Sequence, residues 1–404
     1  MEKIVIGVIR EGKVPPDFRV PLTPTQCVEV MNKYPNVKVV VQASPVRRFK
    51  DNEYADLGIE VREDMSDCDI LMGVKEVPID MLIPEKTYLF FSHTIKKQAH
   101  NAKLIRAILD KKIRLIDYET IRDTNNKRII GFGRYAGIVG TYEGFRAFGL
   151  KHKLFDLKSP SQCEDRVEME EEMKKIVLPP TSKFVLTGFG RVGNGAQEIM
   201  KLLPIERVSP KAFLTDKFDH PVYVHLDTHE YYERKVGGGF DKKDFYSNPE
   251  HYFSVLHSYV KRADMYVACH LWASGNPPLI TKKDVEAPDW KCMVIADVSC
   301  DTDGPIAPTI RASKIDDPFF GYDRLNHVET DFHAENAIGM MTIDNLPCEL
   351  PKDASEDFGN ELLSKVIPLL IGEDPDEIIW KATETLNGEL TPHYEYLSDY
   401  AGMA

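Results

Sequence analysis

Short apolar runs separated by amphipathic stretches organise the first third of the chain. Helical spacing of apolar residues predicts helices at Pro24–Tyr34, Lys50–Leu57 and Lys96–Lys111, and Thr23 is a suitable N-cap for the first. Strands that alternate with helices favour a parallel sheet covered on both faces, as in a doubly wound α/β domain. Five short apolar runs each have the length of a buried strand. We predict strands at Lys3–Ile9, Val37–Val41, Asp69–Val74, Tyr88–Ser92 and Ile113–Asp117.

A glycine motif lies near the middle of the chain, in the sequence KFVLTGFGRVGNGA at Lys183–Ala196. Gly188, Gly190 and Gly193 have the spacing G-x-G-x-x-G, with an apolar run before them and a helical pattern after them. An ordinary glycine-rich turn is the alternative interpretation. Because strand, glycine turn and helix occur in the order that a dinucleotide fold needs, we interpret the segment as a cofactor site.

Each glycine of the motif has its own physical task. Gly188 permits the tight turn, Gly190 allows a pyrophosphate to approach the backbone, and Gly193 allows helix and strand to pack closely. The N–H groups at the start of the following helix would hold the phosphates.

Cofactor preference depends on the residue that ends the second strand of such a unit. If that strand is Glu206–Ser209, then Ser209 with a neighbouring cation favours NADP. If it ends at Asp216 instead, NAD is favoured. The interval from Gly188 to Ser209 is the more usual one, so we predict NADP over NAD.

The aromatic and charged stretch Tyr223–Lys261 is interpreted as an insertion outside the sheet.

Two residues with acid–base chemistry come after successive predicted strands. Lys75 follows DILMGV and His93 follows YLFFS. If these strands are neighbours, both side chains emerge at the carboxyl edge of the sheet, where ligands of doubly wound folds bind. Taken singly, a solvated loop lysine and a hydrogen-bonded cap are the plainer interpretations. Together they predict an acid–base pair. Arg19, after the first strand, would suit a carboxylate substrate, although a surface arginine is the alternative.

The rest of the chain predicts a second domain and a returning tail. GFGRYAGIVGTYEGFRAFG at Gly131–Gly149 predicts a packed inter-domain helix whose glycines serve close packing, and Ser159–Lys175 predicts a solvated helical face. We expect a discontinuous substrate domain, 1–135 with 345–404, and a dinucleotide-binding domain at 136–344. The fold class is therefore α/β, with two Rossmann-like doubly wound domains, the first discontinuous, and a cleft between them.

Composition narrows the function classes. A net charge of −13 over 404 residues argues against nucleic-acid and anionic-membrane partners. Seven scattered cysteines, an odd number and never in C-x-x-C, suit reduced thiols and a cytoplasmic protein, and they predict no metal site. We expect no signal peptide and no membrane span. Oligomeric state is left open.

Six runs of the chain resemble the saccharopine dehydrogenase family. These runs are GVKEVP, FFSHTIKKQ, IRLIDYE, GFGRVGNGAQ, ADVSCDTDGPI and IDNLPCELPKDAS. They are most like the lysine–ketoglutarate reductase domain of aminoadipic semialdehyde synthase, and more distantly similar to the alanine dehydrogenase/transhydrogenase group. The resemblance covers nearly the whole chain and implies reversible hydride transfer between NAD(P) and saccharopine, formed through the imine of lysine and 2-oxoglutarate.

The resemblance also implies site residues. Lys75 matches the family's acid–base lysine, His93 its catalytic histidine and Arg19 its substrate-binding arginine. Gln98 and Arg128 fall where the family contacts substrate. The positions that fall in its cofactor turn and late cofactor loop are Gly190, Arg191, Val192, Ile343, Asp344 and Leu346. Two other functions are kept as alternatives: another amino-acid dehydrogenase, such as one acting on pyruvate and ammonia, and a non-catalytic nucleotide-binding redox sensor.

Overall fold

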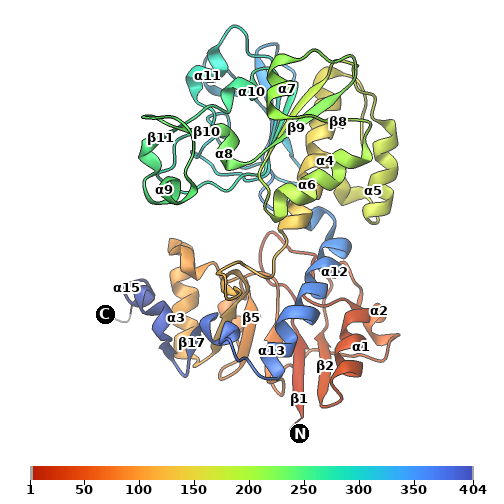
Figure 1. Ribbon diagram of the computed structural model, residues 1–404. Helices are drawn as coiled ribbons and strands as arrows, with labels where there is room; N and C mark the ends of the chain where they lie inside the picture. The colour runs from red at the N-terminus through yellow and green to blue at the C-terminus, as the bar shows by residue number, and fades with distance from the viewer. Residues whose placement is uncertain (1–2, 403–404) are drawn as a thin grey trace. The chain divides into compact units, whose positions relative to one another are not determined.

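The computed structural model describes residues 3–402. The chain divides into two compact units (Figure 1). Unit 1 comprises the chain up to Phe132 and again from Pro351, and unit 2 comprises Gly133–Leu350. Each unit is built on its own eight-stranded sheet with helices around it, which confirms the predicted class of two Rossmann-like α/β domains.

The sheet of unit 1 has the order β18-β17-β6-β5-β4-β1-β2-β3. The strands from β6 to β3 are all parallel, whereas β17 and β18 are antiparallel. The last two strands come from the returning C-terminal segment, which extends the sheet beside β6. The strand bounds are β1 Ile4–Val8, β2 Val37–Gln42, β3 Glu60–Arg62, β4 Ile70–Met72, β5 Thr87–Phe90, β6 Arg114–Asp117, β17 Thr383–Leu386 and β18 Glu389–Leu390.

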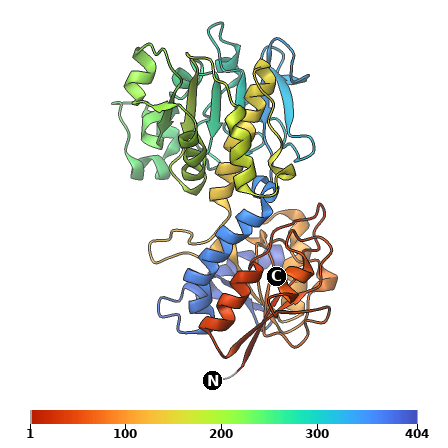
Figure 2. The same ribbon diagram turned by 90° about the vertical axis from the view of Figure 1, so that its right-hand side faces the viewer.

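The first helix of unit 1 shows how local sequence sets an element. Thr23 caps α1, and its capping box with Gln26 satisfies two N–H groups at the helix start. The Gln26 amide also donates to Asn360 Oδ1 at 2.9 Å, which joins α1 to α12 of the returning segment (Figure 2). The helices of unit 1 are α1 Pro24–Lys33, α2 Asp51–Ala55, α3 Ala102–Asp110, α12 Pro351–Glu361, α13 Ile367–Ile371, α14 Ile378–Lys381 and α15 Ser398–Ala401. Its shorter turns are η1 Ile79–Met81, η2 Thr94–Lys96, η3 Ala99–Asn101, η4 Tyr118–Thr120, η9 Leu362–Val366 and η10 Pro392–Leu397.

The sheet of unit 2 has the order β15-β14-β16-β13-β12-β7-β9-β8. The strands from β16 to β8 are parallel, and β14 runs antiparallel to both of its neighbours. A separate antiparallel pair is formed by β10 and β11. The strand bounds are β7 Lys183–Thr187, β8 Glu206–Arg207, β9 Val222–Leu226, β10 Tyr232–Arg234, β11 Tyr252–Ser254, β12 Met265–Ala268, β13 Val294–Asp297, β14 Phe319–Asp323, β15 Val328–Thr330 and β16 Ala337–Met341.

Glycines on α4 allow this long helix to pack tightly, as predicted. A Cβ at Gly137 would stand 1.8 Å from the carbonyl oxygen of Val192 on α6, and one at Gly144 would stand 2.9 Å from Cβ of Ala296 on β13. Helices α4 and α6 consequently lie side by side. The helices of unit 2 are α4 Gly133–His152, α5 Arg166–Glu172, α6 Arg191–Leu202, α7 Pro210–Thr215, α8 Thr228–Tyr231, α9 Lys242–Ser247, α10 His257–Val260 and α11 Lys282–Glu286, with shorter turns η5 Pro160–Gln162, η6 Met173–Lys175, η7 Pro249–His251 and η8 Leu346–Glu349.

The strand predicted at Glu206–Ser209 forms in part, as the two-residue edge strand β8, but the expectation that it neighbours the glycine strand β7 is wrong. On that side of the sheet β7 pairs with β9, which is buried along its whole length. The residues Tyr223–Leu226 therefore belong to the sheet, while the inserted part outside it starts only after β9 and contains β10, α9 and β11. The five-residue apolar run VYVHL has the length of a buried strand, but the charged residues after it obscured the pattern.

Candidate functional site

Four neighbouring parallel strands of unit 1, β6, β5, β4 and β1, end at one edge of the sheet. The predicted adjacency of the strands before Lys75 and His93 is confirmed, because β4 and β5 pair in parallel with Met72 opposite Leu89. Lys75 follows β4 and His93 follows β5, so both lie at this edge. Two carboxylates that were not selected from the sequence, Glu76 and Glu119, lie there too.

His93 is held by a carboxylate from the neighbouring loop. Its Nδ1 lies 2.7 Å from Oε1 of Glu76, and Oε2 of Glu76 lies 2.7 Å from Nζ of Lys13. Hydrogen bonds to His93 and Lys13 lower the pKa of Glu76 to about 2, although burial opposes the shift. His93 has a left-handed backbone, with φ of 54°, and its ring stacks on Phe91. The imidazole is therefore fixed through Nδ1 and keeps a partly exposed ring, with 20% of the side chain accessible.

Lys75 lies in a mostly buried position beside other charges. Burial and the nearby Arg19 guanidinium lower the pKa of its amine. The backbone N–H groups of Val74 and Lys75 donate to the Glu11 carboxyl group at 2.6 and 2.9 Å, which ties down the loop that carries the amine. Burial raises the pKa of Glu11 to about 8. An amine with a lowered pKa is a better base near neutral pH than an exposed lysine.

Arg19 is placed near Lys75, but in an ion pair. Its Nη2 lies 2.5 Å from Oδ2 of Asp17, its Nε donates to Oδ1 of Asp17 at 2.9 Å, and both side chains are buried. The guanidinium also lies over the ring of Phe132, 4.2 Å from its centre. Arg19 thus contributes positive charge beside the Lys75 amine, and its direct contact with a substrate carboxylate stays a prediction.

Arg128 and Gln98, the other two residues expected to contact substrate, lie in different environments. Arg128 donates to Oε1 of Glu119 at 3.0 Å, and Lys96 lies 3.2 Å from the same oxygen. These two half-exposed cations therefore stand together at the end of β6. Gln98 is exposed and precedes η3, and its backbone carbonyl accepts a hydrogen bond from the Tyr400 hydroxyl at 2.6 Å.

In unit 2 the glycine turn has the geometry that its motif predicts. Gly188 has φ of 94°, and Gly190 is the N-cap of α6. A Cβ at Gly193 would stand 1.8 Å from the Gly188 carbonyl oxygen, whereas a Cβ at Gly190 would meet nothing within 4 Å. Arg191 and Val192 open the twelve-residue helix α6. The open side of the turn at Gly190, next to the N–H groups of α6, fits the pyrophosphate of a dinucleotide.

A buried histidine on β9 braces this turn. His225 Nε2 lies 2.6 Å from the carbonyl oxygen of Gly188, and its ring stacks on Phe189 at 3.8 Å between centres. Burial lowers the pKa of His225 to about 4, so the ring is neutral and donates from Nε2 at neutral pH. The sequence gives no signal for this role, because it depends on the pairing of β9 with β7.

The prediction that Ser209 or Asp216 ends the second strand of the dinucleotide unit is wrong. Ser209 is the N-cap of α7 and Asp216 is its C-cap, so neither ends a strand. The strand next to the glycine strand ends at Leu226, whose carbonyl accepts from Gly188 N at 3.0 Å, and the next residue is Asp227. The preference for NADP that rested on Ser209 consequently loses its structural basis.

The late cofactor residues follow β16, another strand of the parallel part of the sheet. Asp344 is exposed there, while Ile343 and Leu346 are buried. Leu346 contacts α4, because a Cβ at Gly140 would meet its side chain at 3.0 Å. Asp344 is thus the member of this group that can reach a ligand directly.

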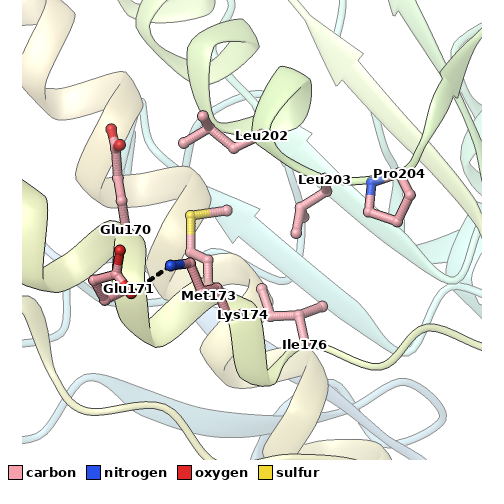
Figure 3. A pocket seen from close by; sticks show the side chains of 8 residues that line it. All are labelled: Glu170, Glu171, Met173, Lys174, Ile176, Leu202, Leu203 and Pro204. Atoms are coloured by element: carbon pink, nitrogen blue, oxygen red, sulfur yellow. Dashed lines mark hydrogen bonds and ion pairs between the residues drawn. The ribbon is translucent and has the colours of Figure 1, made fainter.

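An open groove elsewhere on unit 2 is separate from the glycine turn. It lies between the α5–η6 segment and the C-terminal end of α6, where Leu202, Leu203 and Pro204 form one wall (Figure 3). The turn lies at the other end of this helix, roughly 18 Å away at 1.5 Å per residue. Lys174 and Glu171, which line the groove, are paired with each other at 2.5 Å.

Similarity to known proteins extends over nearly the whole chain. Residues 7–139 match the family model "Alanine dehydrogenase/PNT, N-terminal domain". The chain is 32% identical to alpha-aminoadipic semialdehyde synthase of Arabidopsis thaliana over 97% of its own length and 41% of that protein. It is 25% identical to saccharopine dehydrogenase [NAD(+), L-lysine-forming] of Yarrowia lipolytica, over 89% of this chain and 91% of that one.

A solved L-alanine dehydrogenase structure shares the fold, with a TM-score of 0.66 and 16% identity over 99% of both chains. The chain spans less than half the length of the aminoadipic semialdehyde synthases that it matches. No helix among residues 3–402 is long and apolar enough to cross a membrane. Residues 7–139 thus match the alanine dehydrogenase/PNT N-terminal domain, and nearly the whole chain is homologous to aminoadipic semialdehyde synthase and to saccharopine dehydrogenase.

Proposed function

We propose that the chain is a lysine-forming saccharopine dehydrogenase, or lysine–ketoglutarate reductase, which interconverts saccharopine with lysine and 2-oxoglutarate. The observation that carries this proposal is the grouping of Lys75, Glu76 and His93 at one sheet edge, with His93 Nδ1 2.7 Å from the Glu76 carboxylate. A relative whose name states this chemistry, saccharopine dehydrogenase [NAD(+), L-lysine-forming] of Yarrowia lipolytica, matches 89% of the chain.

The chemistry needs proton transfer at two kinds of atom. Imine formation from an amine and a keto acid removes protons from nitrogen and releases the carbonyl oxygen as water. Lys75, with its lowered pKa, can accept a proton from nitrogen, while His93 can exchange one with oxygen. The negative charge of Glu76 stabilises the imidazolium that forms when His93 takes a proton, and it keeps the ring in one orientation.

Saccharopine carries three carboxylates, so its site needs positive charge. Arg19 supplies a buried cation beside Lys75, and Arg128 and Lys96 supply a half-exposed pair at Glu119. We assign the substrate carboxylates to Arg128 and Lys96, with Arg19 orienting the amine. Gln98 would contribute an amide donor from the start of η3.

A bound nicotinamide dinucleotide supplies the hydride donor or acceptor. The residues that would hold its phosphates are Gly188, Gly190, Arg191, Val192 and Gly193, because they form the turn and the first turn of α6. Asp344 would approach it from the loop after β16.

We propose NAD as the preferred cofactor. Asp227 directly follows β9, the strand paired with β7, and an acid at this place accepts from the ribose 2′-hydroxyl and repels a 2′-phosphate. Half of its side chain is exposed. A hollow beside it, lined by Phe240 and Tyr246 among others, offers aromatic faces to an adenine ring. Arg207, whose guanidinium lies 5.6 Å from the centre of the Phe189 ring, is a nearby cation that would favour a 2′-phosphate instead.

The cellular setting is a smaller part of the proposal. All seven cysteines are free, which fits a reducing compartment, and we propose the cytoplasm. Small molecules are the proposed partners: saccharopine, lysine and 2-oxoglutarate.

A substrate panel tests the proposal. Purified protein is assayed with lysine plus 2-oxoglutarate, and with pyruvate plus ammonia, each with NADH and with NADPH. Turnover that requires both lysine and 2-oxoglutarate, and that is faster with NADH, is expected. Turnover with pyruvate and ammonia would assign an alanine dehydrogenase instead. Cofactor binding without turnover on any substrate would favour the redox sensor.

A further inference from the structure

The residues on both sides of His93 are bound to buried carboxyl groups. Ser92 and Thr94 are fully buried, and so are Asp117 at the end of β6 and Glu384 on β17. Asp117 belongs to the N-terminal part of unit 1, whereas Glu384 belongs to the C-terminal segment that returns to it. The returning segment thus reaches the residues next to the candidate catalytic imidazole.

Four side-chain oxygens form an unbroken chain through this cluster. Asp117 Oδ2 lies 2.6 Å from Ser92 Oγ, Ser92 Oγ lies 2.5 Å from Thr94 Oγ1, and Thr94 Oγ1 lies 2.5 Å from Glu384 Oε2. All three separations are those of short O–H···O hydrogen bonds. Two oxygens this close, buried and without a hydrogen between them, would repel each other.

Counting hydrogens identifies the protonation state. Three contacts need three hydrogens, but the hydroxyls of Ser92 and Thr94 supply only two. The third must come from a carboxyl group at one end of the chain. If Glu384 carries it, the donors point from Glu384 through Thr94 and Ser92 to an ionised Asp117, and if Asp117 carries it, they point the other way.

We propose that Asp117 and Glu384 share one proton through Ser92 and Thr94, and that this closed chain is the positioning device that holds His93 at the reaction centre. The proton sharing stands on the geometry alone, while its catalytic purpose rests on the proposed function. His93 has the left-handed φ of 54°, which only a few per cent of non-glycine residues adopt, and flanking residues fixed on both sides keep it there.

The surroundings of Asp117 and Glu384 favour one bound proton on the pair over none. The titratable groups that interact with the pair are Glu119, His93 and three tyrosines, Tyr394, Tyr396 and Tyr400. Burial, Asp117 and Glu119 raise the pKa of Glu384 well above its ordinary range, and burial raises that of Asp117. Oxygen Oε1 of Glu384 has no hydrogen-bond partner among the described residues, so nothing there stabilises a second negative charge.

Two variants distinguish a proton shared between Asp117 and Glu384 from an ionised Glu384 carboxylate that only supports the structure. Glu384→Gln keeps a donor to Thr94 Oγ1 and so reproduces the protonated form, whereas Thr94→Val removes the middle of the chain at nearly constant volume. Thr141→Val is the matched control, since Thr141 is fully buried in unit 2 and its hydroxyl has no partner among the described residues.

The first measurement is the infrared difference spectrum between the native protein and Glu384→Gln at neutral pH. We expect the C=O stretch of one protonated carboxyl group in the native protein and its loss in the variant. The second measurement is turnover. We expect Glu384→Gln and Thr141→Val to stay within twofold of the native kcat, and Thr94→Val to lose at least about tenfold in kcat with little change in KM.

Two results would overturn the proposal. One is a difference spectrum without a protonated carboxyl group, which would exclude the shared proton even in a protein that turns over no substrate. The other is equal loss of turnover in Glu384→Gln and Thr94→Val, which would show that the carboxylate itself is needed. The infrared result does not depend on activity, so a failed substrate panel would reject the proposed function without deciding the protonation state.

Discussion

Glu76 Oε1 and His93 Nδ1 lie 2.7 Å apart, although the two residues belong to loops that follow different strands. Because Glu76 is the neighbour of Lys75 in sequence, one loop after β4 provides both the buried amine and the carboxylate that orients the imidazole. Nδ1 is engaged by Glu76, so proton transfer to a substrate falls to Nε2 of His93. The Lys75 amine and the His93 imidazole are therefore linked through the Lys75–Glu76 peptide bond and the hydrogen bond between Glu76 and His93.

Removal of either group should abolish most of the turnover without removing the cofactor site. We expect Lys75→Ala and His93→Ala each to lower kcat by on the order of a hundredfold to ten-thousandfold, the range for a lost general acid or base. NADH binding, measured by fluorescence titration, should stay within about twofold. Lys103→Ala and His100→Ala, both at exposed positions of the same unit, are the controls and should leave kcat unchanged. Loss of NADH binding in both active-site variants would contradict the assignment.

The Glu76 contact also predicts a dependence of stability on pH. The folded protein holds the pKa of Glu76 at about 2, below the ordinary 4.5, through His93 and Lys13. A carboxylate with a depressed pKa stabilises the fold at pH values above its unfolded pKa, and this contribution disappears as the pH falls through the folded value. The free energy of unfolding of the native protein minus that of Glu76→Gln should thus decline as the pH falls from about 5 towards 2. Urea unfolding at a series of pH values measures it, and a difference that does not vary with pH would contradict the contact.

The position of the candidate acid–base pair at one sheet edge was predictable from sequence because its signal is local. Lys75 and His93 each come after a compact apolar run, and neighbouring parallel strands place the residues after them at one edge of the sheet. Glu76 has no such signal, since a carboxylate beside a lysine is ordinary until the fold sets His93 opposite it. The chain from Asp117 to Glu384 is still less predictable, because it joins two segments far apart in sequence.

Asp227, the residue that we propose sets cofactor preference, was missed for a different reason. The interval from the glycine turn to the next strand is usually about 20 residues, and this expectation selected Ser209. In the structure the short edge strand β8 and the helix α7 lengthen that crossing, so β9, the next strand along the chain that pairs with β7, begins only at Val222. Strand order is a tertiary property, and spacing alone does not determine it.

Asp227 makes the cofactor preference testable. We expect Asp227→Asn to weaken NADH binding by about tenfold to a hundredfold, because a hydrogen bond from the ribose to a charged acceptor contributes about 1.5–3 kcal/mol. NADPH binding should improve, since repulsion of the 2′-phosphate is removed. Dissociation constants for both cofactors measure the change, and Asp219→Asn, at a fully exposed carboxylate of the same unit, is the control. Equal effects on the two cofactors would place the ribose elsewhere.

Gly193→Ala and Gly190→Ala, both in the glycine turn, test folding and cofactor binding separately. At Gly193 a methyl group would stand 1.8 Å from the Gly188 carbonyl oxygen, a backbone atom, so Gly193→Ala should destabilise the protein by about 1–3 kcal/mol and lower its Tm. At Gly190 the same methyl group meets no atom within 4 Å and φ is −77°, so Gly190→Ala should cost at most about 1 kcal/mol, through loss of a favourable N-cap. The open space at Gly190 is where the pyrophosphate would lie, and its methyl group should raise the Kd for NADH at least tenfold. Thermal unfolding and NADH titration of both variants provide the comparison. If Gly190→Ala binds NADH as tightly as the native protein, the dinucleotide does not approach the backbone at this turn.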